Sequence, residues 1–144
     1  YVSMALFLSF VPLLMGLGGN IGNQSATIIV RGLSTDVLRG RAALSIITRE
    51  VLVGGLIGAF LGAVVFVALV LMNHLFSFAA IVGISVLINS LVASFLGTSL
   101  PIFLKKSKID PAVASAPFIS STLDILGQII YFVTLIIAIT YYIQ

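Results

Sequence analysis

Cysteine is absent from this sequence of 144 residues, and histidine occurs only once. Without cysteine the chain forms no disulfide, offers no thiolate to a metal and has no cysteine nucleophile. A single histidine argues against a zinc centre and against a Ser-His-Asp catalytic centre. The residue types therefore give no support to an enzyme, and we expect a different class of protein.

Charged residues are also scarce: they make up 8% of the chain, about a third of the roughly 25% typical of soluble domains. Residues 1–30, 51–104 and 125–144 contain no Lys, Arg, Asp or Glu, and the mean hydropathy is +1.30. A soluble domain covers itself with charged side chains, whereas lipid requires only apolar side chains and internally satisfied backbone groups. We therefore predict an integral membrane protein surrounded by a lipid bilayer.

The apolar segments between the charged loops are each long enough to cross a bilayer, which takes about 20 residues. They run far longer than the roughly 10-residue alternating strands of a membrane barrel, so we expect helices. The polar pair Asn73-His74, followed by Ser77, predicts a short turn inside the long charge-free stretch. The prediction is an all-α membrane protein with a single transmembrane domain, 1–144, and four helices at about 2–31, 45–72, 78–104 and 111–142.

The seven basic residues fall into two groups, both in loops that four membrane crossings place on the same side of the bilayer. Because short cytoplasmic loops are enriched in Lys and Arg, we assign this side to the cytoplasm and both termini to the outside. So few basic residues in two short loops indicate topology, and they do not favour nucleic-acid binding. The residues are Arg31, Arg39, Arg41 and Arg49, then Lys105, Lys106 and Lys108.

The first predicted helix carries polar and small residues at offsets 0, 3, 4, 7, 8 and 11, which place them on one helical face. We call this face the polar stripe: Gly16, Gly19, Asn20, Asn23, Gln24 and Thr27. Polar residues in a membrane helix face protein or water, so the stripe marks an interior side. Its amide oxygens suit a hydrated cation, and they suit hydrogen bonding between helices equally well.

Two further features favour helix packing. Gly54, Gly58 and Gly62 recur at four-residue spacing, which is typical of a close contact between membrane helices. Asn89 lies deep in the third predicted helix, where an interhelical hydrogen bond is the favoured interpretation.

Asp124 is the only acid predicted to lie deep in the membrane. It follows Pro111 by 13 residues, which at about 1.5 Å per residue is roughly 20 Å into the fourth helix. No Lys or Arg lies in any span to pair with it, so the carboxyl is either protonated and hydrogen-bonded or faces water and a cation. Polar neighbours at helical offsets favour the cation: Pro117, Ser120, Ser121, Gln128 and Tyr131.

Carboxylate, amide, hydroxyl and backbone oxygens are hard ligands, which suit Mg²⁺, Ca²⁺ or Mn²⁺. Mg²⁺ keeps several of its waters and is usually held through one or two carboxylates. Two copies of Asp124, one from each of two chains related by a two-fold axis, would supply these two carboxylates.

Several segments resemble the MgtE-type magnesium channel family. PLLMGLGGNIGNQSAT (residues 12–27), followed by Arg31-Gly32, resembles the second membrane helix of that family. DPAVASAPFISSTLD (110–124) resembles the start of its last helix, including the ion-pathway aspartate. REVLVG (49–54) and NSLVASFLGTSLP (89–101) resemble its third and fourth helices. The resemblance covers essentially the whole chain.

The resemblance implies a homodimeric, multi-pass channel in a bacterial or archaeal inner membrane, with Mg²⁺ passing between the subunits. It assigns ion binding to Asp124 with help from Ser120, and the adjoining pathway to Gly19, Asn20, Gly22, Asn23 and Gln24. The family usually has five membrane helices plus cytoplasmic amino-terminal and CBS domains, and this chain starts at the second helix. A proton- or Na⁺-coupled exchanger and a non-conducting assembly subunit are the alternative functions.

Overall fold

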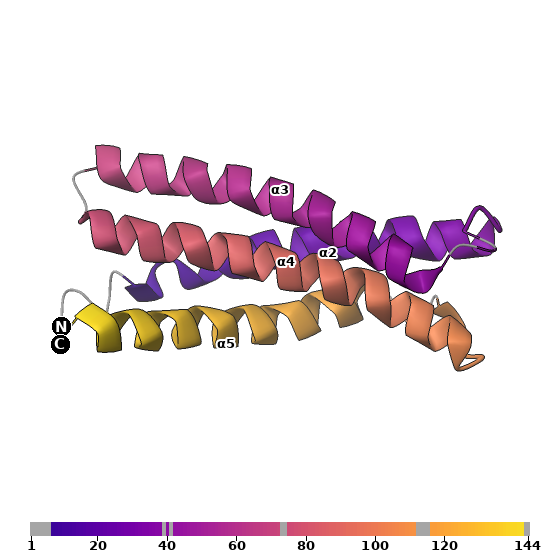
Figure 1. Ribbon diagram of the computed structural model, residues 1–144. Coiled ribbons are helices and arrows are strands. Elements are labelled where there is room, and N and C mark those ends of the chain that lie inside the picture. Colours follow the sequence, from indigo (N-terminus) through magenta and orange to yellow (C-terminus); the bar gives the residue numbers. More distant parts are fainter. Residues whose placement is uncertain (1–6, 39, 41, 73–74, 112–115, 143–144) are drawn as a thin grey trace.

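The chain folds into four long helices that run back and forth beside one another (Figure 1). The computed structural model describes residues 7–38, 40, 42–72, 75–111 and 116–142. The helices are α2 (Val11–Ser34), α3 (Ala43–Leu71), α4 (Phe76–Lys106) and α5 (Ala116–Tyr142). The described ranges contain no strand. The predicted all-α bundle is therefore confirmed, while the predicted Asn73-His74 turn lies outside the described residues.

Two of the helices carry a proline in their first described turn. Pro12 lies in the first turn of α2, where a missing N–H costs no hydrogen bond, and a turn at Ser9 and Phe10 separates α2 from the helical residues 7 and 8. Pro117 likewise lies at the start of α5, which is described from Ala116 onward, and residues 112–115 of the predicted fourth helix lie outside the described residues. Asp124 lies eight residues beyond Ala116, which is about 12 Å along the helix axis.

Among the described residues, three helical stretches are long and apolar enough to cross a membrane: Ala43–Leu71, Phe76–Lys106 and Pro117–Ile137. These lengths and compositions identify a membrane protein. α2 is not among the three, although its 24 residues give it a length of about 36 Å. Its polar stripe lowers its hydropathy. α2 is therefore long enough to span a membrane, but it is less uniformly apolar than the other three helices.

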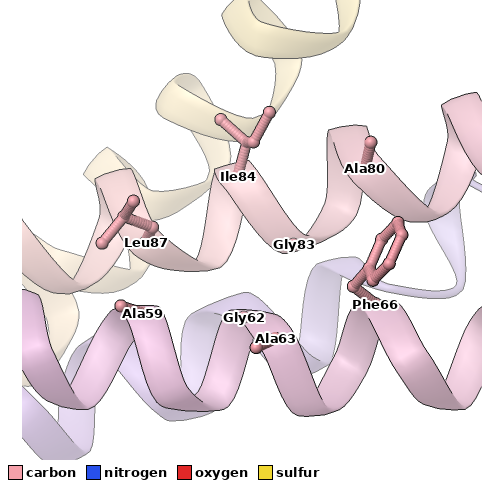
Figure 2. Close-up of a pocket in the computed structure, with 8 residues that line it drawn as sticks. All are labelled: Ala59, Gly62, Ala63, Phe66, Ala80, Gly83, Ile84 and Leu87. Carbon is pink, nitrogen blue, oxygen red and sulfur yellow. The ribbon is translucent and has the colours of Figure 1, made fainter.

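α4 lies at the centre of the bundle, because it packs against α3, α2 and α5, while α2 also packs against α5 (Figure 1). α3 buries little apart from its glycines. Gly54 lies against Ser94, and Gly58 against Ser90. Figure 2 shows the third contact, where Gly62 of α3 lies beside Gly83 of α4 at a shallow apolar pocket that both residues line. The packing interpretation of the α3 glycines is confirmed.

α2 and α4 finish at the same end of the bundle (Figure 1), and both carry basic residues in their last turns. Arg31 lies in the last turn of α2, and Lys105 lies in the last turn of α4. The Lys105 ammonium donates a hydrogen bond of 2.7 Å to the Leu33 carbonyl, which places a positive charge at the negative end of the α2 dipole. Arg39 and Arg41 lie outside the described residues.

Candidate ion-binding site

Asp124 and Ser120 of α5 lie over the backbone of Gly19 on α2. A Cβ atom at Gly19 would be 3.7 Å from Asp124 Oδ1 and 3.8 Å from Ser120 Oγ. Asn23, one turn further along α2, donates a hydrogen bond of 2.6 Å from Nδ2 to Ser120 Oγ. The structure therefore brings four of the predicted site residues together between two helices that are far apart in sequence.

The Asn23 side chain is only half satisfied. Its Nδ2 is bonded to Ser120, but its Oδ1 is buried and is the one buried side-chain polar atom without a hydrogen-bond partner among residues 7–142 as far as these are described. Leaving such an acceptor unpaired costs about 1–3 kcal/mol. This oxygen therefore needs a donor or a cation from outside the described residues.

Asp124 is half-buried, and within the described part of the chain no side chain donates a hydrogen bond to it or forms an ion pair with it. The sequence allows two states for the Asp124 side chain: a protonated carboxyl that is hydrogen-bonded to protein, or a carboxylate that faces water and a cation. The described contacts supply no protein partner for the first.

The polar stripe is divided between two environments. Gly19 and Asn23 face α5, as the contacts above show. The other members, Gly16, Asn20, Gln24 and Thr27, are exposed on the outside of this chain. The expectation that the whole stripe faces the interior is therefore correct for one edge only. Exposed amides are costly in hydrocarbon, so this edge requires water or a second protein beside it.

The glycines of α2 fall into two classes according to what a side chain would meet. A Cβ at Gly18 would be 2.7 Å from Asn89 Nδ2, and one at Gly22 would collide with the Leu123 side chain. By contrast, a Cβ at Gly16 would meet nothing within 4 Å, and at Gly19 it would make only ordinary contacts. Packing within this chain thus explains Gly18 and Gly22 but not the glycines of the polar stripe.

This difference separates Gly22 from the rest of the predicted site. It packs against Leu123 and the Ala93 carbonyl, and Asp124 and Ser120 are not among its nearest neighbours. Two predicted neighbours of Asp124 also have partners of their own. Tyr131 is buried and donates a hydrogen bond of 2.8 Å to the Phe7 carbonyl, and Gln128 Nε2 lies 3.4 Å from Met15 Sδ.

Asn89 contacts Gly18 and Gly127, which the sequence did not predict. A Cβ at Gly127 would be 3.0 Å from Asn89 Oδ1, so the amide lies between α2 and α5. The sequence did contain a clue to these contacts, because both glycines lie close to predicted site residues. Gly18 adjoins Gly19, and Gly127 follows Asp124 by three residues. Spacing along one helix does not show which side chain on another helix fills the space beside a glycine.

The site offers hard oxygen atoms and little else. Its side chains provide one carboxylate, one amide oxygen and one hydroxyl, from Asp124, Asn23 and Ser120. The described residues contain no group of three or more His, Cys, Asp or Glu side chains that could hold a metal ion. A single carboxylate cannot replace the hydration shell of a divalent cation, but it can hold a hydrated one through its waters. Fold and site together define an all-α membrane protein with a cluster of hard oxygen atoms between two helices.

The comparisons with known proteins give the family. The family model for MgtE, described as a divalent cation transporter, matches residues 11–134. The chain is 32% identical over 123 residues to the magnesium transporter MgtE of Bacillus subtilis. It is 35% identical over 122 residues to the magnesium transporter MgtE of Thermus thermophilus. Each match covers 85% of this chain and 27% of the relative, so the chain spans about a quarter of the length of these relatives. The chain belongs to the MgtE family of divalent cation transporters.

Proposed function

We propose that this chain forms the ion-conducting part of a divalent-cation channel, and that Mg²⁺ is the ion it carries. Both named relatives are magnesium transporters, and the oxygen-only site suits a hard cation. In this proposal Asp124, Ser120 and Asn23 bind the hydrated ion beside Gly19. Asn20 and Gln24 line the path next to it, while Gly22 shapes the path indirectly by holding α2 close to α4.

The observation that carries the proposal is the buried, unpartnered Oδ1 of Asn23 beside Ser120. Water molecules of a hydrated cation are hydrogen-bond donors, because the cation polarises their O–H bonds. A hydrated Mg²⁺ held near Asp124 would supply a donor to this oxygen and a counter-charge to the carboxylate. A plain helix-packing role for the polar stripe gives no reason for an acceptor to remain unpaired.

We further propose that the path lies between two copies of the chain. The exposed edge of the polar stripe needs a polar partner, and one chain supplies a single carboxylate. A two-fold axis would bring a second Asp124 toward the same path and would cover both exposed edges with one isologous contact. The ion would then sit between two carboxylates, as Mg²⁺ sites commonly do.

Uptake by liposomes containing the full-length protein tests the proposal. We expect Mg²⁺ to enter down its own gradient, with Ca²⁺, Mn²⁺ and Zn²⁺ compared under the same conditions and protein-free liposomes as the control. Uptake should not depend on an opposing Na⁺ or proton gradient. A requirement for such a gradient would identify an exchanger. No uptake of any divalent ion would identify a non-conducting assembly subunit, and either result would refute the channel.

A further inference from the structure

Asn89 connects the three helices α2, α4 and α5 at the centre of the bundle. It belongs to α4, is 2% exposed, and donates a hydrogen bond of 2.6 Å from Nδ2 to the Leu14 carbonyl of α2. Gly18 on α2 leaves room for one side of the amide, and Gly127 on α5 leaves room for the other. A methyl group at either glycine would press on the amide, so both helices approach it as closely as their backbones allow.

The other buried polar side chains of α4 do not act in this way. Ser85, Ser90, Ser94 and Thr98 each donate a hydrogen bond to the carbonyl four residues earlier in α4 itself. Such bonds satisfy a hydroxyl without fixing the position of a neighbouring helix. The Asn89 bond crosses between helices, so its length and direction depend on where α2 lies relative to α4.

The two glycines that enclose Asn89 adjoin the ion-binding cluster. Gly18 precedes Gly19, whose backbone lies under Asp124, and Gly127 follows Asp124 by three residues on α5. A shift of either helix at Asn89 would therefore change the separation of Gly19 and Asp124. We infer that Asn89 is a positioning residue: it sets the contact between α2 and α5 that brings Asn23, Ser120 and Asp124 together. The consequence for transport rests on the proposed function, whereas the helix placement does not.

Helix placement can be measured without transport. The chain contains no cysteine, so Met15→Cys with Gln128→Cys gives one reporter pair across the α2/α5 contact, at positions whose side chains touch. A short bifunctional thiol reagent should cross-link this pair efficiently in the full-length protein. We expect Asn89→Ala to lower the rate of cross-linking severalfold. Ser94→Ala is the matched control, because Ser94 is equally buried on α4 but faces Gly54 of α3, and it should leave the rate unchanged.

Transport provides the second readout, in proteins that carry no reporter cysteines. In a site that depends on geometry, displacing a side chain by about 1 Å can lower its effectiveness by up to about 100-fold. We therefore expect Asn89→Ala to raise the half-saturating Mg²⁺ concentration by roughly tenfold or more. Ser94→Ala should change it less than about twofold, although both variants lower the melting temperature. A purely structural role for Asn89 would lower the amount of folded protein and the maximal flux and would leave half-saturation unchanged.

If Asn89→Ala does not fold, Gly127→Ala tests the same role of Asn89, because the added methyl group would press on the Asn89 amide from the α5 side. It should also slow cross-linking and raise half-saturation. Unchanged cross-linking in a folded Asn89 or Gly127 variant overturns the inference, and so does slower cross-linking with unchanged half-saturation. If the wild-type protein carries no divalent ion, the proposed function fails, and the cross-linking rates alone then support or overturn the placement of α2 and α5 by Asn89.

Discussion

Asp124→Asn is expected to remove most divalent-cation flux while leaving the fold intact. Asparagine has nearly the same shape but no charge. The attraction between one carboxylate and a divalent ion about 5 Å away is roughly 7 kcal/mol at an effective dielectric constant near 20, before desolvation is subtracted. A small surviving fraction of that attraction would still dominate ion binding, so we expect flux to fall by at least about tenfold, which corresponds to about 1.4 kcal/mol.

The comparison with Asp124→Ala separates charge from structure. If the carboxyl is a neutral hydrogen-bonding group, asparagine should transport almost normally and alanine should mainly lower the melting temperature. If it binds a cation, both variants should lose flux, and the melting temperature of Asp124→Asn should stay close to that of the wild type. Measured Mg²⁺ uptake and thermal melting of the two variants distinguish these cases, and wild-type-like, Mg²⁺-selective flux in Asp124→Asn would refute the assigned site.

Gly97→Ala, which adds a methyl group at a buried position, is expected to destabilise the bundle more than a methyl group added at an exposed position. A Cβ at position 97 would collide with the backbone carbonyl of Gly22, where α4 crosses α2. A backbone carbonyl cannot rotate away as a flexible side chain can, so the helices would have to separate. Overpacking of a well-packed core costs about 1–3 kcal/mol and occasionally more, and we expect the upper part of that range. Thermal unfolding in mild detergent measures the loss.

Gly16→Ala is the control for this substitution, since position 16 is exposed and a Cβ there would meet nothing within 4 Å. Its melting temperature should be no lower than that of the wild type, because the added methyl meets no atom of this chain and alanine is a better helix former than glycine by about 0.5–1 kcal/mol. Equal melting temperatures for the two variants would show that α2 and α4 are not in backbone contact at Gly22 and Gly97.

The helices could be predicted from the sequence because they depend on the residues within each segment and not on contacts between segments. Lipid selects long apolar runs, and the scarcity of charge between residues 51 and 104 left no other fold class. The limits of the helices were less predictable. Pro12 and Pro117 are compatible with a kink inside a helix or with the first turn of one, and neighbouring sequence alone does not decide between these positions.

The candidate site could be predicted in its residue types but not in its contacts. Asn23 and Asp124 stand out because polar residues are rare in such a chain. That Asn23 bonds Ser120, while Gln24 next to it faces outward, depends on how α2 is rotated against α5. That rotation follows from Gly18 and Gly22 fitting against other helices, which is a property of the assembled bundle and not of the spacing within α2.

The proposed ion path requires water beside the exposed edge of the polar stripe, and thiol accessibility measures this directly. Single cysteines at Asn20 and Gln24 can be compared with one at Phe60, an exposed apolar position on α3 that should face lipid. A water-soluble thiosulfonate reacts with the thiolate, which forms in water and not in hydrocarbon. We predict rapid modification at positions 20 and 24 that Mg²⁺ slows, and no modification at position 60. Cysteines at 20 and 24 that are as unreactive as the one at 60 would contradict an ion path along this face.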